Sequence, residues 1–110
     1  MKPDLWSLYA LMQKSRLFEE AVTQLWKDGL ISGEMHLGTG EEAIVAGIIS
    51  QLKAEDAMAL DHRGTPPLLM RGVDPVLILR ELLGRPDGLC GGKVVICTFS
   101  QKVIWLPHPA

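Results

Sequence analysis

Residues 36–49, His-Leu-Gly-Thr-Gly-Glu-Glu-Ala-Ile-Val-Ala-Gly-Ile-Ile, join a glycine-rich loop to an apolar segment. The glycines allow the loop backbone to approach a ligand closely, and a helix N-terminus follows directly. We predict that this helix begins near Thr39 and ends near Lys53. Because residues 43–49 are apolar almost all round, the sequence predicts that the helix is buried rather than lying on the surface.

A longer amphipathic helix is predicted upstream of this loop. Apolar residues recur at helical spacing from Leu5 to Trp26 and form one wide stripe. Asp4 is a candidate N-cap, and Gly29 is expected to end the helix. The charged side chains that fall off the stripe are expected to be solvated, and they are Lys14, Arg16, Glu19 and Glu20.

Downstream, the pattern predicts a mainly helical chain with at most one or two strands. Residues 57–60 are short and apolar and are a candidate parallel strand, although periodicity alone does not distinguish it from a helical segment. Pro66 and Pro67 are expected to break the chain. Asp74 and Pro75 then open a third helix that covers residues 76–83.

The composition describes one small globular domain of 110 residues, 47% hydrophobic and 22% charged. A formal net charge of −2 offers no basic surface for nucleic acid, and no apolar run reaches the roughly 20 residues that span a bilayer. Cys90 and Cys97 provide neither a disulfide framework nor a zinc site. We therefore expect a cytoplasmic protein with no nucleic-acid or membrane partner.

The first loop holds a candidate proton donor or acceptor. His36 can exchange a proton near neutral pH, and the alternative is a capping loop in which the histidine is structural. Glu41 and Glu42 are candidates for acid–base chemistry. Because they are adjacent, they point to different faces of a helix, which favours an interaction with the helix dipole instead.

The second loop, residues 61–65, follows the candidate strand, at the position where open parallel sheets bind ligands. Arg63 with His62 suits a phosphate-type anion because guanidinium groups match its oxygens. The alternative is a surface ion pair between Arg63 and Asp61. Taken alone, these residues indicate a helical anion-binding segment.

Five short stretches of the chain, spread over residues 5–93, carry a family resemblance. They are Leu17-Phe18-Glu19-Glu20, His36-Leu37 with Gly40-Glu41-Glu42-Ala43, His62-Arg63-Gly64, Arg71-Gly72-Val73-Asp74-Pro75 and Glu81-Leu82-Leu83-Gly84-Arg85. No single stretch is specific. In this order and at this separation, however, the set resembles the alpha subunit of thiamine-diphosphate-dependent 2-oxo acid dehydrogenases of the pyruvate and acetoin type.

The resemblance implies an α/β thiamine-diphosphate-binding fold for the whole subunit, with a parallel sheet that this chain cannot complete. It implies that Arg63 and His62 contact the diphosphate of the cofactor and that His36 lines the channel near the thiazolium. The implied reaction is decarboxylation of a 2-oxo acid such as pyruvate, or cleavage of acetoin. The implied partners are a beta subunit and a transacetylase whose lipoyl arm accepts the acyl group.

One departure from the family pattern bears on activity. The family holds magnesium and the diphosphate with a Gly-Asp-Gly motif and a downstream asparagine, and this sequence contains no Gly-Asp-Gly. The chain alone is therefore expected to be inactive. An alternative function is that of a small helical interaction protein that docks a beta-type dehydrogenase subunit without catalysis.

Residues 94–110 differ in character from the rest of the chain. They contain one charged residue, Lys102, although charged residues make up 22% of the whole sequence. Synonymous codons can be chosen for residues 94–102 that, read with one added base, spell Gly-Gly-His-Met-His-Leu-Phe-Ser-Lys. The genetic code permits this reading without forcing it, and the segment would complete a family motif after Gly92-Lys93. We expect residues 1–93 to be the N-terminal part of the dehydrogenase domain and residues 94–110 to be a frameshift-derived tail without native structure.

Sequencing the encoding DNA tests the frameshift. We expect a second reading frame that encodes the family motif after codon 93 and continues downstream to a Gly-Asp-Gly motif. An intact frame for residues 94–110 in independent reads, with no alternative frame continuing downstream, would refute the hypothesis.

Overall fold

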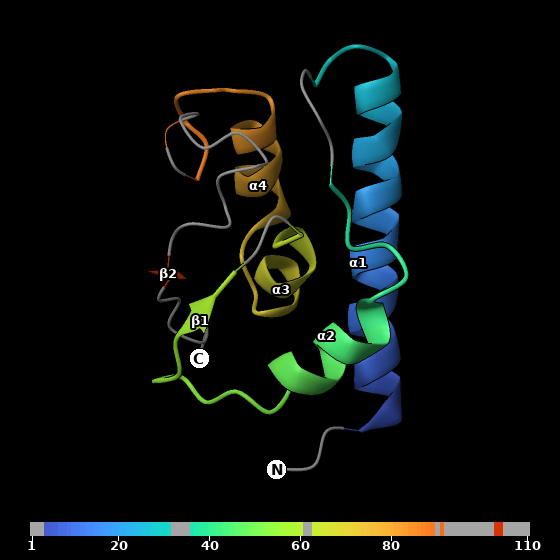
Figure 1. Cartoon of the computed structure of the whole chain (residues 1–110), viewed down its shortest axis with the longest axis vertical. Helices are drawn as coiled ribbons and strands as arrows, with labels where there is room; N and C mark the ends of the chain where they lie inside the picture. The colour runs from blue at the N-terminus through green and yellow to red at the C-terminus, as the bar shows by residue number, and fades with distance from the viewer. Residues whose placement is uncertain (1–3, 32–35, 61–62, 90, 92–102, 105–110) are drawn as a thin grey trace.

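The computed structural model describes the chain except for residues 1–3, 32–35, 61–62, 90, 92–102 and 105–110 (Figure 1). The described residues are mainly helical, as the sequence predicts. In chain order, the elements are α1 (Leu5–Lys27), α2 (Glu42–Ile49), β1 (Met58–Ala59), α3 (Thr65–Met70), α4 (Pro75–Leu82) and β2 (Val103–Ile104).

Aspartate caps begin the two helices that the sequence predicts best. The Asp4 side chain accepts hydrogen bonds from the backbone N–H groups of Trp6 at 2.7 Å and Ser7 at 3.4 Å, which starts α1. Asp74 accepts from the backbone N–H of Val76 at 2.9 Å, which starts α4. Both caps are local interactions between neighbouring residues, and both predicted helix starts are confirmed.

Helix α3 corrects the prediction that two prolines break the chain. Pro66 and Pro67 lie in its first turn. The N–H groups of a first helical turn have no partner inside the helix, so prolines are tolerated there. The helix that they begin carries deeply buried apolar side chains, with Leu68 0% and Leu69 1% exposed.

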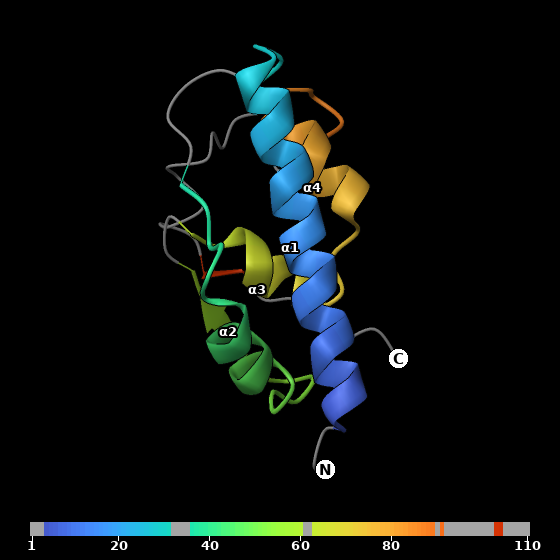
Figure 2. The same ribbon diagram turned by 90° about the vertical axis from the view of Figure 1, so that its right-hand side faces the viewer.

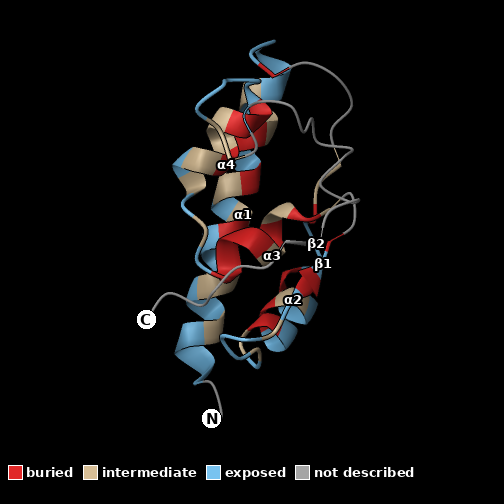
Figure 3. Ribbon diagram, turned by 90° about the vertical axis from the view of Figure 1, so that its left-hand side faces the viewer, coloured by how far each residue is buried: buried red, intermediate tan, exposed pale blue. Residues whose placement is uncertain are grey.

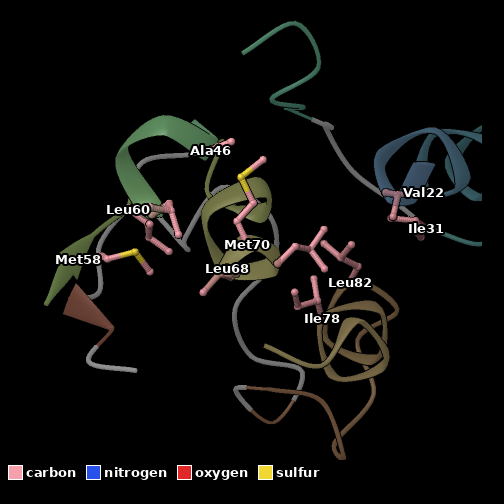
Figure 4. Packing of buried hydrophobic residues seen from close by; sticks show 11 residues of the cluster. Val22, Ile31, Ala46, Met58, Leu60, Leu68, Met70, Ile78 and Leu82 are labelled. Carbon is pink, nitrogen blue, oxygen red and sulfur yellow. The ribbon is translucent and has the colours of Figure 1, made fainter. Parts of the chain in front are cut away.

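Helix α3 lies at the centre of the molecule and contacts both α1 and α2 (Figures 1 and 2). Figure 4 shows Leu68 and Met70 of α3 between Met58 of β1 and Ile78 of α4. The buried apolar cluster consists of Val22, Ile31, Ala46, Ile49, Met58, Leu60, Leu68, Leu69, Met70, Ile78 and Leu82. One core therefore joins all four helices and β1.

Helix α2 is shorter and more exposed than predicted. It covers Glu42–Ile49 rather than residues 39–53. Ala46 and Ile49 are buried, but Ile44 is 68% exposed and Ile48 is 60% exposed. Figure 3 shows one buried and one exposed face on this helix. The prediction of all-round burial is wrong for the described chain, because α1 and α3 cover α2 from one side only.

The predicted strand at residues 57–60 is present as β1, but its partner is antiparallel. Met58 lies opposite Ile104 and Ala59 lies opposite Val103. An apolar run reports burial and not the direction of a neighbouring strand, so the expectation of a parallel strand is corrected. Among the described residues the sheet has two strands of two residues each. No described helix is long and apolar enough to cross a membrane.

Candidate anion-binding site

Two charged side chains hold one peptide group, the one that links Leu37 to Gly38. Its carbonyl oxygen accepts a hydrogen bond from Nη1 of Arg63. Its N–H donates to the Glu19 carboxylate, at 2.9 Å to Oε2 and 3.2 Å to Oε1. The structure therefore brings α1 and both candidate loops together at this peptide.

The predicted site residues lie beside this peptide where the structure describes them. His36 is half-buried and immediately precedes Leu37. Arg63 is also half-buried, and its bond to the Leu37 carbonyl places the second loop against the first. His62 and Asp61 fall outside the described residues, and so does the alternative of an Arg63–Asp61 ion pair.

Glu19 is a site residue that the sequence analysis placed wrongly. It was expected on a solvated helix face, but it is only 1% exposed. Ser15 and Val22 are buried on the same helix, four residues before and three residues after it. This spacing puts the three side chains on one face of α1 and was the available signal. A search for apolar residues at helical spacing does not find this face, because Ser15 and Glu19 are polar.

Burial changes the ionisation of Glu19. Removal from water raises its pKa to about 7, and the nearby charges of Glu42 and Glu41 add to this effect. The hydrogen bond from Gly38 and the positive charge of Arg63 act in the opposite direction and lower the pKa. The carboxyl group is therefore close to half-ionised at neutral pH.

Gly38 fits closely between α1 and α3. A Cβ atom at this position would lie 2.6 Å from Cγ of Pro66 and 3.2 Å from Oε1 of Glu19. The first distance is shorter than any ordinary contact between carbon atoms, so a side chain at this position requires the loop or Pro66 to shift. The glycine thus allows the loop to reach the Glu19 carboxylate.

Glu42 closes the other end of the first loop. Its Oε1 lies 2.5 Å from Nε of Arg16, and its Oε2 accepts from the backbone N–H of Gly40 at 2.8 Å. The hydrogen bond from Arg16 is the main reason that the pKa of Glu42 is lowered. Glu42 is buried while Glu41 is exposed, which confirms that the adjacent carboxylates point to different faces.

The sequence model of a protein family described as the dehydrogenase E1 component matches residues 10–105. The chain belongs to the dehydrogenase E1 component family. The resemblance to dehydrogenase alpha subunits is therefore confirmed, and the E1 match includes all of the loop residues described above.

Curated E1 alpha subunits show the same relationship. The chain is 39% identical over 92 residues to the alpha subunit of acetoin:2,6-dichlorophenolindophenol oxidoreductase from Cupriavidus necator, which covers 84% of this chain and 28% of the relative. It is 36% identical over 93 residues to the pyruvate dehydrogenase E1 alpha subunit of Zymomonas mobilis, and this match covers 84% of this chain and 26% of the relative. This E1 chain thus spans about a quarter of the length of the curated relatives that it matches.

The donor set suits one part of the cofactor that the E1 family implies. Arg63, which bonds to the Leu37 carbonyl, carries the guanidinium N–H groups that bind phosphate oxygens, and the half-buried His36 next to Leu37 is a separate imidazole at the same segment. Among the described residues, no group of three or more His, Cys, Asp or Glu side chains could hold a metal ion. The chemistry of the Arg63 guanidinium therefore suits the diphosphate of thiamine diphosphate, the cofactor that the E1 family implies.

Gly38→Ala tests the close contact between the loop and α3. We expect the added methyl group to lower the free energy of unfolding by about 1–3 kcal/mol, because it would overlap Pro66. Gly47→Ala is the matched control, since nothing lies within 4 Å of its Cβ position in α2. There the higher helix propensity of alanine should stabilise the protein by about 0.5–1 kcal/mol. Urea denaturation measures both, and equal effects would contradict the structure.

Glu19→Gln tests the burial of the carboxylate through the pH dependence of stability. Because the pKa of Glu19 is raised from 4.5 to about 7, the folded chain binds the proton more tightly than the unfolded chain. The free energy of unfolding should therefore fall as the pH rises from 4.5 to 7 and stay level above that. Relative to Glu19→Gln, we expect the wild type to lose on the order of 3 kcal/mol across this range.

Urea denaturation at pH 5 and pH 8 measures the difference. Glu20→Gln is the control, because Glu20 is exposed on the same helix and should leave the pH dependence unchanged. A stability difference between wild type and Glu19→Gln that does not vary with pH would show that Glu19 is solvated.

Proposed function

We propose that this chain is the N-terminal segment of the alpha subunit of a thiamine-diphosphate-dependent dehydrogenase. Its substrate would be a 2-oxo acid such as pyruvate, or acetoin. Family membership supports the class of reaction, and the names of the relatives supply these two substrates. The observation that carries the proposal is the bond from Arg63 to the carbonyl of Leu37, because it joins the two candidate loops into one site.

Within this site, we assign the cofactor contacts to residues of both loops. Arg63 and His62 would bind the diphosphate, because its negative oxygens need cationic N–H donors. His36 would line the channel near the thiazolium and hold or move a proton there. Thiamine diphosphate, when bound, supplies the electron sink that decarboxylation of a 2-oxo acid requires.

The remaining parts of the catalytic machinery would come from outside this segment. The sequence contains no Gly-Asp-Gly motif for magnesium, so the chain by itself would be inactive. A beta subunit would complete the active site, and the lipoyl arm of a transacetylase would accept the product group. In the whole alpha subunit we place this segment in an α/β fold whose parallel sheet is built mostly by other residues.

A second candidate function is docking without catalysis. An apolar groove of about 300 Å³ lies along α2 and β1, and it supports this function because exposed apolar surface of this kind marks interaction sites. Its lining residues are Ile44, Val45, Ile48, Ile49, Leu52, Ala57, Met58, Ala59, Leu60 and Pro67. In that case the chain would bind a beta-type subunit through this groove and leave the Arg63 site unused.

A graft separates the two functions. Residues 1–93 would replace the matching segment of the Cupriavidus necator alpha subunit, which is co-expressed with its own beta subunit. We expect this graft to reduce 2,6-dichlorophenolindophenol with acetoin as the substrate, and we expect the reduction to require added thiamine diphosphate. In this graft, Arg63→Met should weaken the apparent cofactor affinity about 10- to 150-fold, the effect of losing one hydrogen bond between charged groups.

Arg80→Met is the control for the graft, because Arg80 lies on α4, where its Nε is 3.6 Å from the Asp87 carboxylate. It should leave the cofactor affinity unchanged. A graft that co-purifies with the beta subunit yet shows no activity would favour docking. If the graft with Arg63→Met and the unmodified graft bind the cofactor equally well, Arg63 does not bind the diphosphate.

A further inference from the structure

The Leu37–Gly38 peptide connects two charged groups that do not belong to neighbouring segments of the sequence. The described peptide bonds are all trans, so the carbonyl and the N–H of this peptide point in opposite directions. Arg63 binds the carbonyl and Glu19 binds the N–H. The cation and the anion therefore hold the peptide from opposite sides.

This arrangement couples the two side chains through the peptide. Hydrogen bonds to ionised groups are about twice as strong as neutral ones, and a chain of such bonds polarises each member. A rotation of the peptide plane would weaken both bonds at once. The hydrogen bond between the Gly38 N–H and Glu19 thus helps to set the direction of the Leu37 carbonyl. The position of the Arg63 guanidinium depends on that direction.

The packing around Gly38 supports the hydrogen bond between its N–H and the Glu19 carboxylate. Pro66 of α3 and the Glu19 carboxylate both lie close to the Cα of Gly38, and Pro66 leaves no room for a Cβ atom there. Glu19 itself is 1% exposed, so water does not compete for its oxygens. The Leu37–Gly38 peptide is therefore packed against both α3 and the Glu19 carboxylate.

We propose that Glu19 is a positioning residue, which orients Arg63 toward the bound diphosphate by holding the N–H of the Leu37–Gly38 peptide. The inference rests on the proposed function for the identity of the anion at Arg63. The link between Glu19, the peptide and Arg63 does not depend on that identity, and it can be tested without any ligand.

The charge state of Glu19 should control the strength of the link. Several charged or titratable groups surround it. Arg63 favours the ionised carboxylate, whereas Glu41 and Glu42 of the first loop and α2 oppose it. Arg16 of α1 is bound to Glu42, and His36 lies two residues before Gly38. Because the pKa of Glu19 is about 7, its carboxyl group ionises as the pH rises through neutrality and then accepts a stronger hydrogen bond from the Gly38 N–H.

Nuclear magnetic resonance of the full, isotope-labelled 110-residue chain tests this link. Between pH 5 and pH 9, we expect the resonances of the Glu19 carboxyl carbon, the Gly38 amide and the Arg63 guanidinium to shift together as Glu19 ionises, with one common midpoint near pH 7. Glu19→Gln should abolish the pH-dependent change in the resonances of both Gly38 and Arg63. The control Glu20→Gln, an exposed neighbour, should leave all three curves unchanged.

The result that overturns the proposal is a pH-dependent change in the Arg63 resonances that persists in Glu19→Gln, because a group other than Glu19 would then be its source. If circular dichroism shows that Glu19→Gln does not fold, the wild-type curves decide alone. Different midpoints for Gly38 and Arg63 would then show that the two are not coupled. A failure of the diphosphate assignment is seen separately, in the Arg63→Met graft, since no anion is added in this titration.

Discussion

The peptide between Leu37 and Gly38 is the point on which the candidate site depends. A buried carboxylate is stable only when a donor compensates for the water that it has lost, and the Gly38 N–H provides that donor for Glu19. The same peptide gives Arg63 its acceptor. One backbone group thus satisfies two charged side chains from distant parts of the sequence, and it does so next to His36.

The groove along α2 and β1 leaves apolar side chains exposed. Ile44 and Ile48 stay exposed because the described elements cover α2 from one side only. The chain spans about a quarter of the length of its curated relatives. A segment of this size buries its own core around α3, yet the surface that it leaves open is the kind that further chain or a second subunit covers.

Local chemistry explains which helices the sequence predicts well. Asp4 and Asp74 each cap a helix through bonds to residues two or three positions away, so the helix starts are encoded in short stretches. The two prolines of α3 were interpreted as a break because their first-turn role is recognised only when a helix follows. The exposure of Ile44 could not be predicted, since an apolar helix does not indicate how many sides are covered.

The sequence by itself determined the family, the order of the two loops and the choice of His36 and Arg63 as candidate site residues. These follow from residue types at fixed separations, which are properties of the chain alone. Only the tertiary structure decided that Glu19 is buried and that its partner is the Gly38 N–H. The physical reason is that the ionisation and bonding of a helix residue depend on which distant segment packs against its face, and helical periodicity carries no information about that segment.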